Sequence, residues 1–167
     1  MTLEALNGLG VEALREALRS CCGSSVWVEK MTAIFPVADR FVLFAAAEEV
    51  WRNCSEKDWR EAFSHHPKIG DLEGLKKKFA AMGAWAAAEQ SGTSGAATAV
   101  LEALQEGNRV YEEKFGYIFI VCATGKPAAE MLGSLRERLG NDAQTEILIA
   151  MGEQEKITYL RLQKLLS

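Results

Sequence analysis

The stretch YIFIVCATGKP at residues 117–127 decides the fold class, because it begins with the one run of β-branched and aromatic residues in the chain. Such a run between Gly116 and Gly125 predicts an extended, buried segment. Its composition alone favours a core strand. An unpaired segment is the alternative, and its backbone N–H and C=O groups would then need partners such as a planar, amide-rich ligand. Strand-forming residues are sparse elsewhere, so the flanking segments determine the rest of the fold.

The sequence on both sides of this run predicts helices. Alanine is abundant and the chain has only three prolines, which favours helical structure. Apolar residues recur at helical spacing over residues 11–22, 26–35, 37–54, 55–63, 69–92 (after an opening turn, as one helix or two), 96–114, 127–140 and 142–166. We therefore expect an all-α protein, with a single compact domain over residues 1–167, about seven to nine helices and one short extended segment near 117–123.

Particular residues predict both ends of one of these helices and the start of another. Ser55 begins a helix and has Asp58 at the N3 position, which is typical of a capping box. Pro67 disfavours helical geometry at the residue before it, so that helix must end there. Asn141, with Gln144 three residues further on, is expected to cap the last helix.

Composition and charge exclude several classes of function. The net charge of −4 gives no basic surface for nucleic acid or an anionic membrane. The longest apolar stretch, FVLFAAAEEVW, is too short and too charged to span a bilayer, and the N-terminus lacks the pattern of a signal peptide. The four cysteines fall at no metal-like spacing, so we expect no metal site, reduced thiols and a cytoplasmic protein.

Both histidines of the chain lie side by side in SHHPKIGD at residues 64–71. Pro67 holds His66 just past the end of a helix, so the His66 side chain points out of the helical register. The ordinary histidine pKa of about 6.5 suits proton transfer at neutral pH. A surface histidine stabilised by the helix dipole would show the same pattern. His65 is expected only to cap the helix or to pack on the surface.

Two other segments contain candidate site residues. Glu89 in WAAAEQSG follows small and aromatic residues by one helical turn, where its carboxylate could orient an imidazole or a ligand. Gln90 adds a donor and an acceptor, although position alone favours a solvated Glu-Gln pair near a helix end. Arg161 shares an apolar stripe with Ile157 and Leu165, and it needs either an anionic partner or a path to water.

In their order along the chain, these segments resemble the 2-oxo-4-hydroxy-4-carboxy-5-ureidoimidazoline (OHCU) decarboxylases of urate degradation. The resemblance runs through CCGSSVWVEKM at 21–31, DWREAFSHHPKIGD at 58–71 and WAAAEQSG at 85–92. It continues with YEEKFGYIFIVCATGK at 111–126 and ends with ERLGND and EKITYLRLQKL. It implies a carboxy-lyase without a metal or organic cofactor, which converts OHCU to (S)-allantoin with stereospecific protonation. It also implies a mainly helical homodimer.

The resemblance also implies a role for each site residue. His66 matches the catalytic histidine, and Glu89 matches the glutamate that holds this histidine or a polar group of the substrate. Gln90 matches a substrate-binding residue, and Arg161 matches the arginine that grips an anionic group of the substrate. Pro67 matches a residue that lines the pocket. The backbone of the extended segment matches the part that hydrogen-bonds the substrate ring, at Ile118, Phe119, Ile120, Val121 and Cys122.

One departure from the family pattern and two alternative functions stay open. Many members have a serine that contacts the substrate where this chain has Ala86, so one hydrogen bond is expected to be missing or replaced by water. An enzyme of the same fold that acts on a related ureido or imidazolone compound is the first alternative. A helical interaction module without catalysis is the second, and it would give His66 no role beyond ending a helix.

Overall fold

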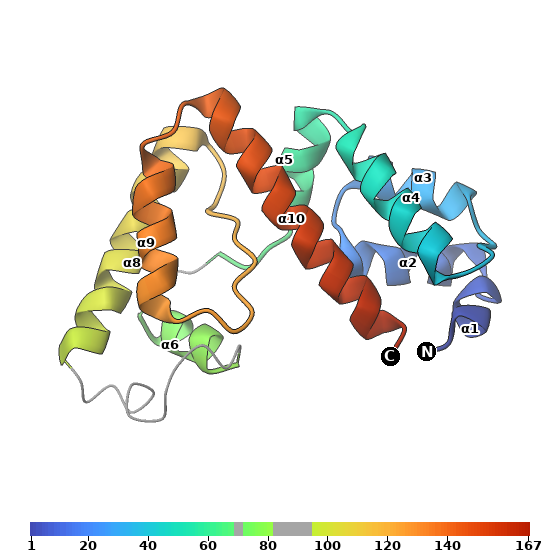
Figure 1. The fold of residues 1–167 in the computed structure, drawn as a ribbon, viewed down its shortest axis with the longest axis horizontal. Coiled ribbons are helices and arrows are strands. Elements are labelled where there is room, and N and C mark those ends of the chain that lie inside the picture. Colours follow the sequence, from blue (N-terminus) through green and yellow to red (C-terminus); the bar gives the residue numbers. More distant parts are fainter. Residues whose placement is uncertain (69–71, 82–94) are drawn as a thin grey trace. The chain divides into compact units, whose positions relative to one another are not determined.

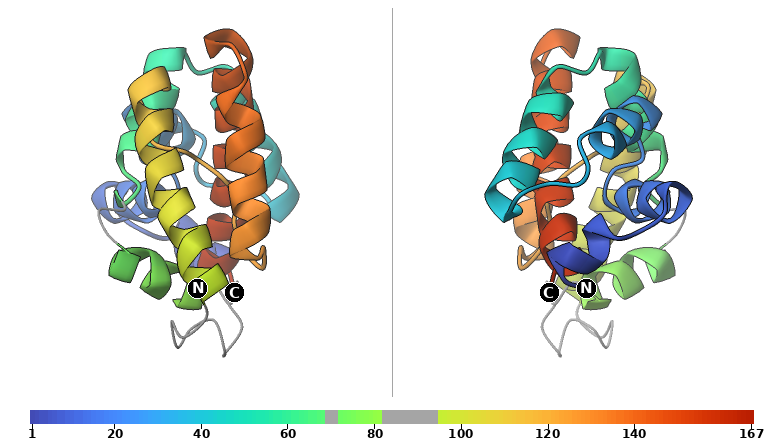
Figure 2. Two further views of the ribbon diagram at one scale, coloured as in Figure 1. Left: turned by 90° about the vertical axis from the view of Figure 1, so that its left-hand side faces the viewer. Right: turned by 90° about the vertical axis from the view of Figure 1, so that its right-hand side faces the viewer.

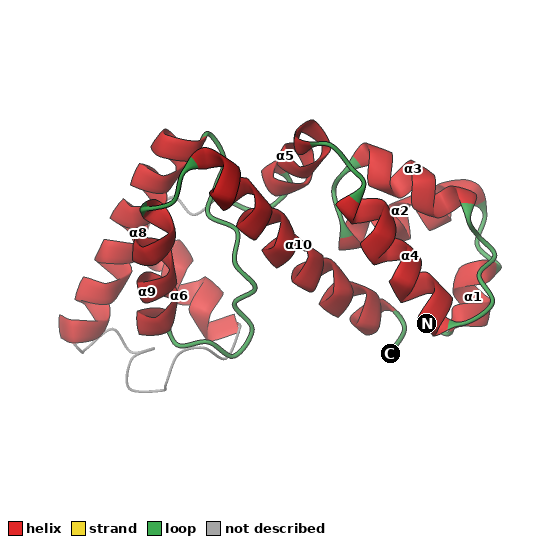
Figure 3. Ribbon diagram, turned by 45° about the horizontal axis from the view of Figure 1, so that its top comes forward, coloured by secondary structure: helices red, strands yellow, loops and turns green. Residues whose placement is uncertain are grey.

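The computed structural model of the chain describes residues 1–68, 72–81 and 95–167. Within these residues it contains nine helices and no strand, which confirms the predicted all-α class. Figure 3 shows the described connections between the helices as irregular loops. None of the described helices is long and apolar enough to cross a membrane. The chain divides into two compact units, residues 1–66 with 151–167 and residues 67–150, and the single domain over residues 1–167 stays a prediction.

The first unit is built around α3 (Ser25–Ala33). Its other helical segments are α1 (Leu3–Asn7), α2 (Val11–Cys21), α4 (Arg40–Arg52), α5 (Glu56–Ser64) and residues 151–165 of α10 (Ala143–Leu165). Helices α2, α4 and α5 all pack against α3 (Figure 1). The buried face of α3 carries Trp27, Val28 and Met31. The Trp27 indole donates a hydrogen bond of 3.1 Å to the carbonyl of Ala47, so its polar atom is satisfied in the core.

Trp51 fixes α10 against α4 within this unit. Its indole N–H donates to the carbonyl of Met151 at 2.8 Å, and the Trp51 carbonyl accepts from the indole of Trp59 at 3.0 Å. One turn along α10, Glu155 pairs with Arg52 of α4 at 2.9 Å. These contacts fix the position of the part of α10 that carries the candidate residue Arg161.

The second unit consists of α6 (Leu72–Ala81), α8 (Gly95–Phe115), α9 (Ala128–Leu139) and residues 143–150 of α10. The long helix α8 lies beside α9, as the left view in Figure 2 shows, and α6 packs on α8. The core of this unit contains the fully buried leucines Leu101 and Leu135, and Tyr111, whose ring lies 4.6 Å from that of Phe115.

The run at residues 117–123 forms neither helix nor strand, so the prediction of a core strand from its composition was wrong. It passes as a loop from α8 to α9 (Figure 3). A strand needs a neighbouring strand, and the described parts of the chain contain none. The β-branched and aromatic residues serve burial instead: Tyr117 and Ile120 are buried, and the Ile120 carbonyl accepts a hydrogen bond from Arg138.

The predicted helix ends agree with the structure at one site and differ at another. Ser55 and Asp58 form the expected capping box at the start of α5. The last helix begins one residue later than predicted, because the Asp142 carboxylate, and not Asn141, accepts from the backbone N–H of Thr145 at 2.7 Å. Asp142 precedes the helix directly and supplies a charged acceptor, whereas the Asn141 amide donates to Glu146.

Candidate active site

His66 lies directly after α5, where the chain leaves the helix. His65 occupies the C-cap position, and the backbone N–H of His66 donates to the carbonyl of Phe63 at 3.2 Å. Pro67 follows and has no N–H to continue the helix. The helix therefore stops where the sequence predicted, and the half-buried His66 side chain is held by a backbone that is fixed on both sides.

The His66 ring contacts a buried glutamine that the sequence analysis did not single out. Its Nε2 lies 2.5 Å from Oε1 of Gln154 on α10. Gln154 is fully buried, and its Nε2 donates to Oγ1 of Thr158, one turn further along the helix, at 3.1 Å. His66 thus stands at the end of a chain of side chains that reaches into the core of the first unit.

Arg161 lies on the same face of α10 as this chain. Gln154, Thr158 and Arg161 follow one another at spacings of four and three residues, which places them on one side of a helix. Gln154 and Arg161 are about 10 Å apart along the helix axis. The Arg161 guanidinium is half-buried, and its Nη1 donates to the carbonyl of Cys21 at 3.4 Å. Within residues 1–68, 72–81 and 95–167, no carboxylate forms an ion pair with it.

Cys21 and Cys22 are buried at the end of α2, close to this face of α10. Burial raises the pKa of the Cys22 thiol to about 12 and also raises the pKa of Cys21, although the charge of Arg161 acts against both shifts. Both groups are therefore neutral thiols at neutral pH, and neither has the character of a nucleophile. The cationic Arg161 is the one charged group on this face of α10 whose chemistry suits an anionic ligand.

His65 packs against the backbone of Gly23, which agrees with the structural role expected for it. A Cβ atom added to Gly23 would lie 2.5 Å from Cγ and 2.6 Å from Cβ of His65. Gly23 is buried, so the chain after α2 approaches the end of α5 more closely than any side chain would permit. Gly23 therefore makes room for His65, the residue before His66.

Replacement of Gly23 by alanine is expected to lower the free energy of unfolding by about 1–3 kcal/mol, the usual effect of forcing an atom into a filled space. Gly133→Ala in α9 is the matched control, because a Cβ there would meet nothing within 4 Å. The control should be neutral or stabilising by up to about 1 kcal/mol, from helix propensity. Urea unfolding of both variants measures the difference, and equal stabilities would contradict the close approach at Gly23.

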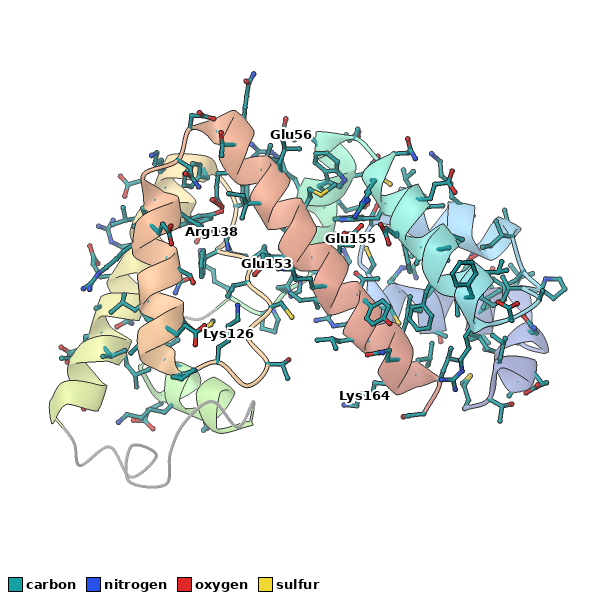
Figure 4. The ribbon with its side chains drawn as sticks, viewed as in Figure 1. Glu56, Lys126, Arg138, Glu153, Glu155 and Lys164 are labelled. Atoms are coloured by element: carbon teal, nitrogen blue, oxygen red, sulfur yellow. The ribbon has the colours of Figure 1, made fainter. Side chains whose placement is uncertain are left out.

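The predicted substrate-lining segment lies in the second unit and is anchored from α9. Ile118, Phe119, Val121 and Cys122 are partly exposed, whereas Ile120 is buried. Arg138 holds this segment twice: its Nη1 donates to the Ile120 carbonyl at 2.7 Å, and its guanidinium lies 4.4 Å from the centre of the Phe119 ring. Figure 4 shows Arg138 pointing from α9 toward this loop.

Arg138 belongs to a buried charge network that the sequence analysis missed. Its guanidinium donates to the fully buried carboxylate of Glu146 from Nε at 3.1 Å and from Nη2 at 2.8 Å. The Tyr111 hydroxyl donates to the same carboxylate at 2.5 Å, and the Asn141 amide donates at 3.2 Å. Burial lowers the pKa of Arg138, but the hydrogen bonds and charge of Glu146 outweigh it and the net shift is upward. Burial and the hydrogen bond to Glu146 raise the pKa of Tyr111.

The remaining predicted site residues are distributed as follows. Pro67 is exposed and opens the second unit, whereas His66 and Arg161 belong to the first. Ala86, Glu89 and Gln90 lie outside the described residues, and their roles stay predictions. Within the described part of the chain, no three His, Cys, Asp or Glu side chains are grouped so that they could hold a metal ion.

Known proteins that resemble the chain share one family. Residues 7–163 match the family model described as OHCU decarboxylase. The uric acid degradation bifunctional protein TTL of Arabidopsis thaliana is 38% identical over 163 residues, which cover 95% of this chain and 49% of that protein. The OHCU decarboxylase of Halalkalicoccus jeotgali is 25% identical over 169 residues, which cover 99% of this chain and 92% of that protein. The chain thus spans about half the length of its Arabidopsis relative.

Solved structures give the same result. A crystal structure of OHCU decarboxylase in the presence of (S)-allantoin matches with a TM-score of 0.69 and 38% identity, covering 89% of this chain and 95% of that one. A crystal structure of (S)-allantoin synthase, at 18% identity and a TM-score of 0.68, shares the fold. From the match over residues 7–163 and the 38% identity to the Arabidopsis protein and to the solved OHCU decarboxylase, we conclude that the chain belongs to the OHCU decarboxylase family.

Proposed function

We propose that the protein decarboxylates OHCU and protonates the product on one face to give (S)-allantoin. The observation that carries the proposal is the arrangement in the first unit of a chain that belongs to this family. There the His66 ring is held by Gln154, which lies on one face of α10. Arg161 lies on the same face and has no carboxylate partner among the described residues. The histidine can move a proton, and the arginine can bind an anionic group.

The proposed reaction needs no cofactor, because the substrate itself can take up the electrons. The bond between the ring and the carboxylate breaks and CO2 leaves, while the electron pair of that bond enters the conjugated imidazolone ring. One proton is then added to the ring carbon that becomes the stereocentre. The protein contributes orientation, removal of water from the carboxylate and delivery of that proton from one side.

In this proposal His66 transfers the proton and Arg161 holds an anionic group of the substrate. Glu89 orients His66 or a polar substrate group, and Gln90 binds the substrate. The position of Ala86 supplies no hydroxyl group to the substrate, which leaves one hydrogen bond to water. The backbone of residues 118–122 keeps the role of hydrogen-bonding the substrate ring, and the anchoring of Ile120 by Arg138 supports this role, since a fixed loop presents its groups in one geometry.

Enzymatically generated OHCU tests the proposal against both alternatives. Mixing it with the purified protein and following its absorbance should show decay many times faster than in buffer. An enzyme for a related ureido or imidazolone compound would leave the OHCU decay unchanged but accelerate the decay of that compound. A non-catalytic interaction module would accelerate neither, and either of these results would reject the proposal.

We also propose that the protein is a homodimer, which the resemblance implies and an exposed apolar groove supports. The groove lies between α4 and α10 of the first unit, has a volume of about 780 Å³, and includes Phe41, Phe44 and Tyr159 in its lining. Phe41 is 81% exposed and Tyr159 is 49% exposed. Glu155, labelled in Figure 4, lines the groove beside them. Apolar surface of this kind is typical of protein interfaces.

Replacement of Phe41 by glutamate is therefore expected to convert a dimer into a monomer, because the new charge would be buried in the interface. Ala38→Glu is the matched control, since Ala38 is exposed and lies outside the groove. Sedimentation equilibrium should give twice the chain mass for the unchanged protein and for the control. A monomeric wild-type protein would contradict the dimer, and a dimeric Phe41→Glu variant would contradict the use of this groove.

A further inference from the structure

We infer that Gln154 is a positioning residue that selects the ring tautomer of His66, with the proton on Nε2 and the lone pair on Nδ1. The inference deepens the proposed function and rests on it for its catalytic consequence. It concerns a residue on α10 that is 88 positions away from His66 in the sequence and that is joined to it by a contact of 2.5 Å.

The contact with Thr158 sets the orientation of the Gln154 amide. Its Nε2 donates to Thr158 Oγ1 at 3.1 Å, so its Oε1 is the atom that faces His66. An amide oxygen only accepts hydrogen bonds, whereas each nitrogen of a neutral imidazole either donates or accepts. The His66 nitrogen that meets this oxygen must therefore carry the proton, and the other nitrogen, Nδ1, carries the lone pair.

The Gln154 amide is held rigidly by its surroundings. Gln154 is fully buried and Thr158 is 6% exposed, so water cannot replace either partner without a large change in the core. The two residues are one turn apart on the same helix, which fixes their separation. The Thr158 hydroxyl oxygen is the acceptor for the Gln154 amide N–H at 3.1 Å.

The consequence for catalysis is that one ring nitrogen is assigned to proton transfer before the substrate binds. A histidine whose tautomer is not selected spends part of its time with the proton on the wrong nitrogen, and a ring that is not held must be ordered in each turnover. Gln154 acts through His66 and is assigned no contact with the substrate. In other enzymes, a buried partner of the catalytic histidine fixes the tautomer and the orientation of the imidazole, and Gln154 has the same role here.

Nitrogen NMR of histidine-labelled protein tests the tautomer without any substrate. The chain has two histidines, so the spectra contain only His65 and His66, and exposed His65 is an internal reference. At a pH about two units above the ordinary histidine pKa of about 6.5, His66 should show a fully protonated Nε2 with a slowly exchanging ring proton. His65 should show the average of two tautomers. A His66 ring with its proton on Nδ1 would overturn the inference.

Removal of the Gln154 amide should weaken the selection of the His66 tautomer and lower the reaction rate. In Gln154→Met, the fraction of His66 rings with the proton on Nε2 is expected to fall, and kcat should fall by about 10- to 100-fold with a much smaller change in KM. Gln163→Met, an exposed glutamine on the same helix, should change neither quantity. If Gln154→Met kept a fully protonated Nε2 and a normal kcat, the inference would be wrong.

Thr158 provides a second pair of variants in case the buried methionine disturbs folding. Thr158→Ser keeps the hydroxyl and should preserve the His66 spectrum, whereas Thr158→Val removes it and should broaden or average the Nε2 signal. Equal spectra for these two variants would contradict the inference. The spectra are also independent of the reaction: a protein that failed to accelerate OHCU decay but kept the expected tautomer would reject the proposed function alone.

Discussion

Replacement of His66 by alanine is expected to lower kcat for OHCU decarboxylation by at least about 100-fold, the lower range for loss of a general acid–base group. No other histidine can take over the proton transfer, because the only other one in the chain, His65, packs against Gly23 at the end of α5. The rate of OHCU disappearance, corrected for decay in buffer, measures the effect.

His65→Ala is the matched control for this prediction. It removes the neighbouring imidazole from the same loop. Because His65 takes no part in the proposed chemistry, kcat should stay within about threefold of the wild-type value. Circular dichroism should show unchanged helix content in both variants. Full activity of His66→Ala, or an equal loss in both variants, would contradict the assignment of proton transfer to His66.

Replacement of Arg138 by methionine is expected to lower the free energy of unfolding by about 3–5 kcal/mol. The change leaves the carboxylate of Glu146 fully buried, with the Tyr111 hydroxyl and the Asn141 amide as its remaining partners among those described above. It also removes the hydrogen bond of 2.7 Å that anchors the Ile120 carbonyl. Arg136→Met is the control, because Arg136 is exposed on the same helix, and it should change stability by less than about 0.5 kcal/mol.

A double variant separates the charge from the packing at this site. When Glu146 is replaced by methionine together with Arg138, no uncompensated buried charge remains, and stability should recover a large part of the loss. Urea unfolding of both single variants and the double variant gives the coupling energy between the two side chains. An Arg138→Met variant that is as stable as Arg136→Met would show that the buried pair does not stabilise the second unit.

Local features of the sequence were sufficient to predict the described helices other than α1 and several of their ends. The capping box of Ser55 and Asp58 and the stop before Pro67 depend on backbone groups within a few residues, which short-range chemistry determines. The run at 117–123 could not be predicted in this way. Its composition is that of a strand, but a strand also depends on a partner elsewhere in the chain, and the described residues provide side-chain anchors such as Arg138 instead.

Candidate site residues stand out in the sequence only where one residue carries the signal by itself. His66 and Arg161 stood out because a histidine before proline and an arginine on an apolar stripe are unusual. Gln154 did not stand out, because its importance depends on His66, which lies 88 residues away and meets it only in the folded chain. The spacing of Gln154, Thr158 and Arg161 on one face of α10 was visible in the sequence, yet spacing alone does not show that this face is buried.

The enantiomer of the allantoin formed from OHCU tests the central claim most directly, namely that His66 delivers a proton to one face of the ring. Without a chiral site, water adds a proton to either face equally, and the product is racemic. Circular dichroism of the completed reaction should therefore show pure (S)-allantoin with the wild-type protein and no signal with His66→Ala, in which only the spontaneous reaction remains. A racemic product with the wild type, or (S)-allantoin at the wild-type rate with His66→Ala, would contradict the account.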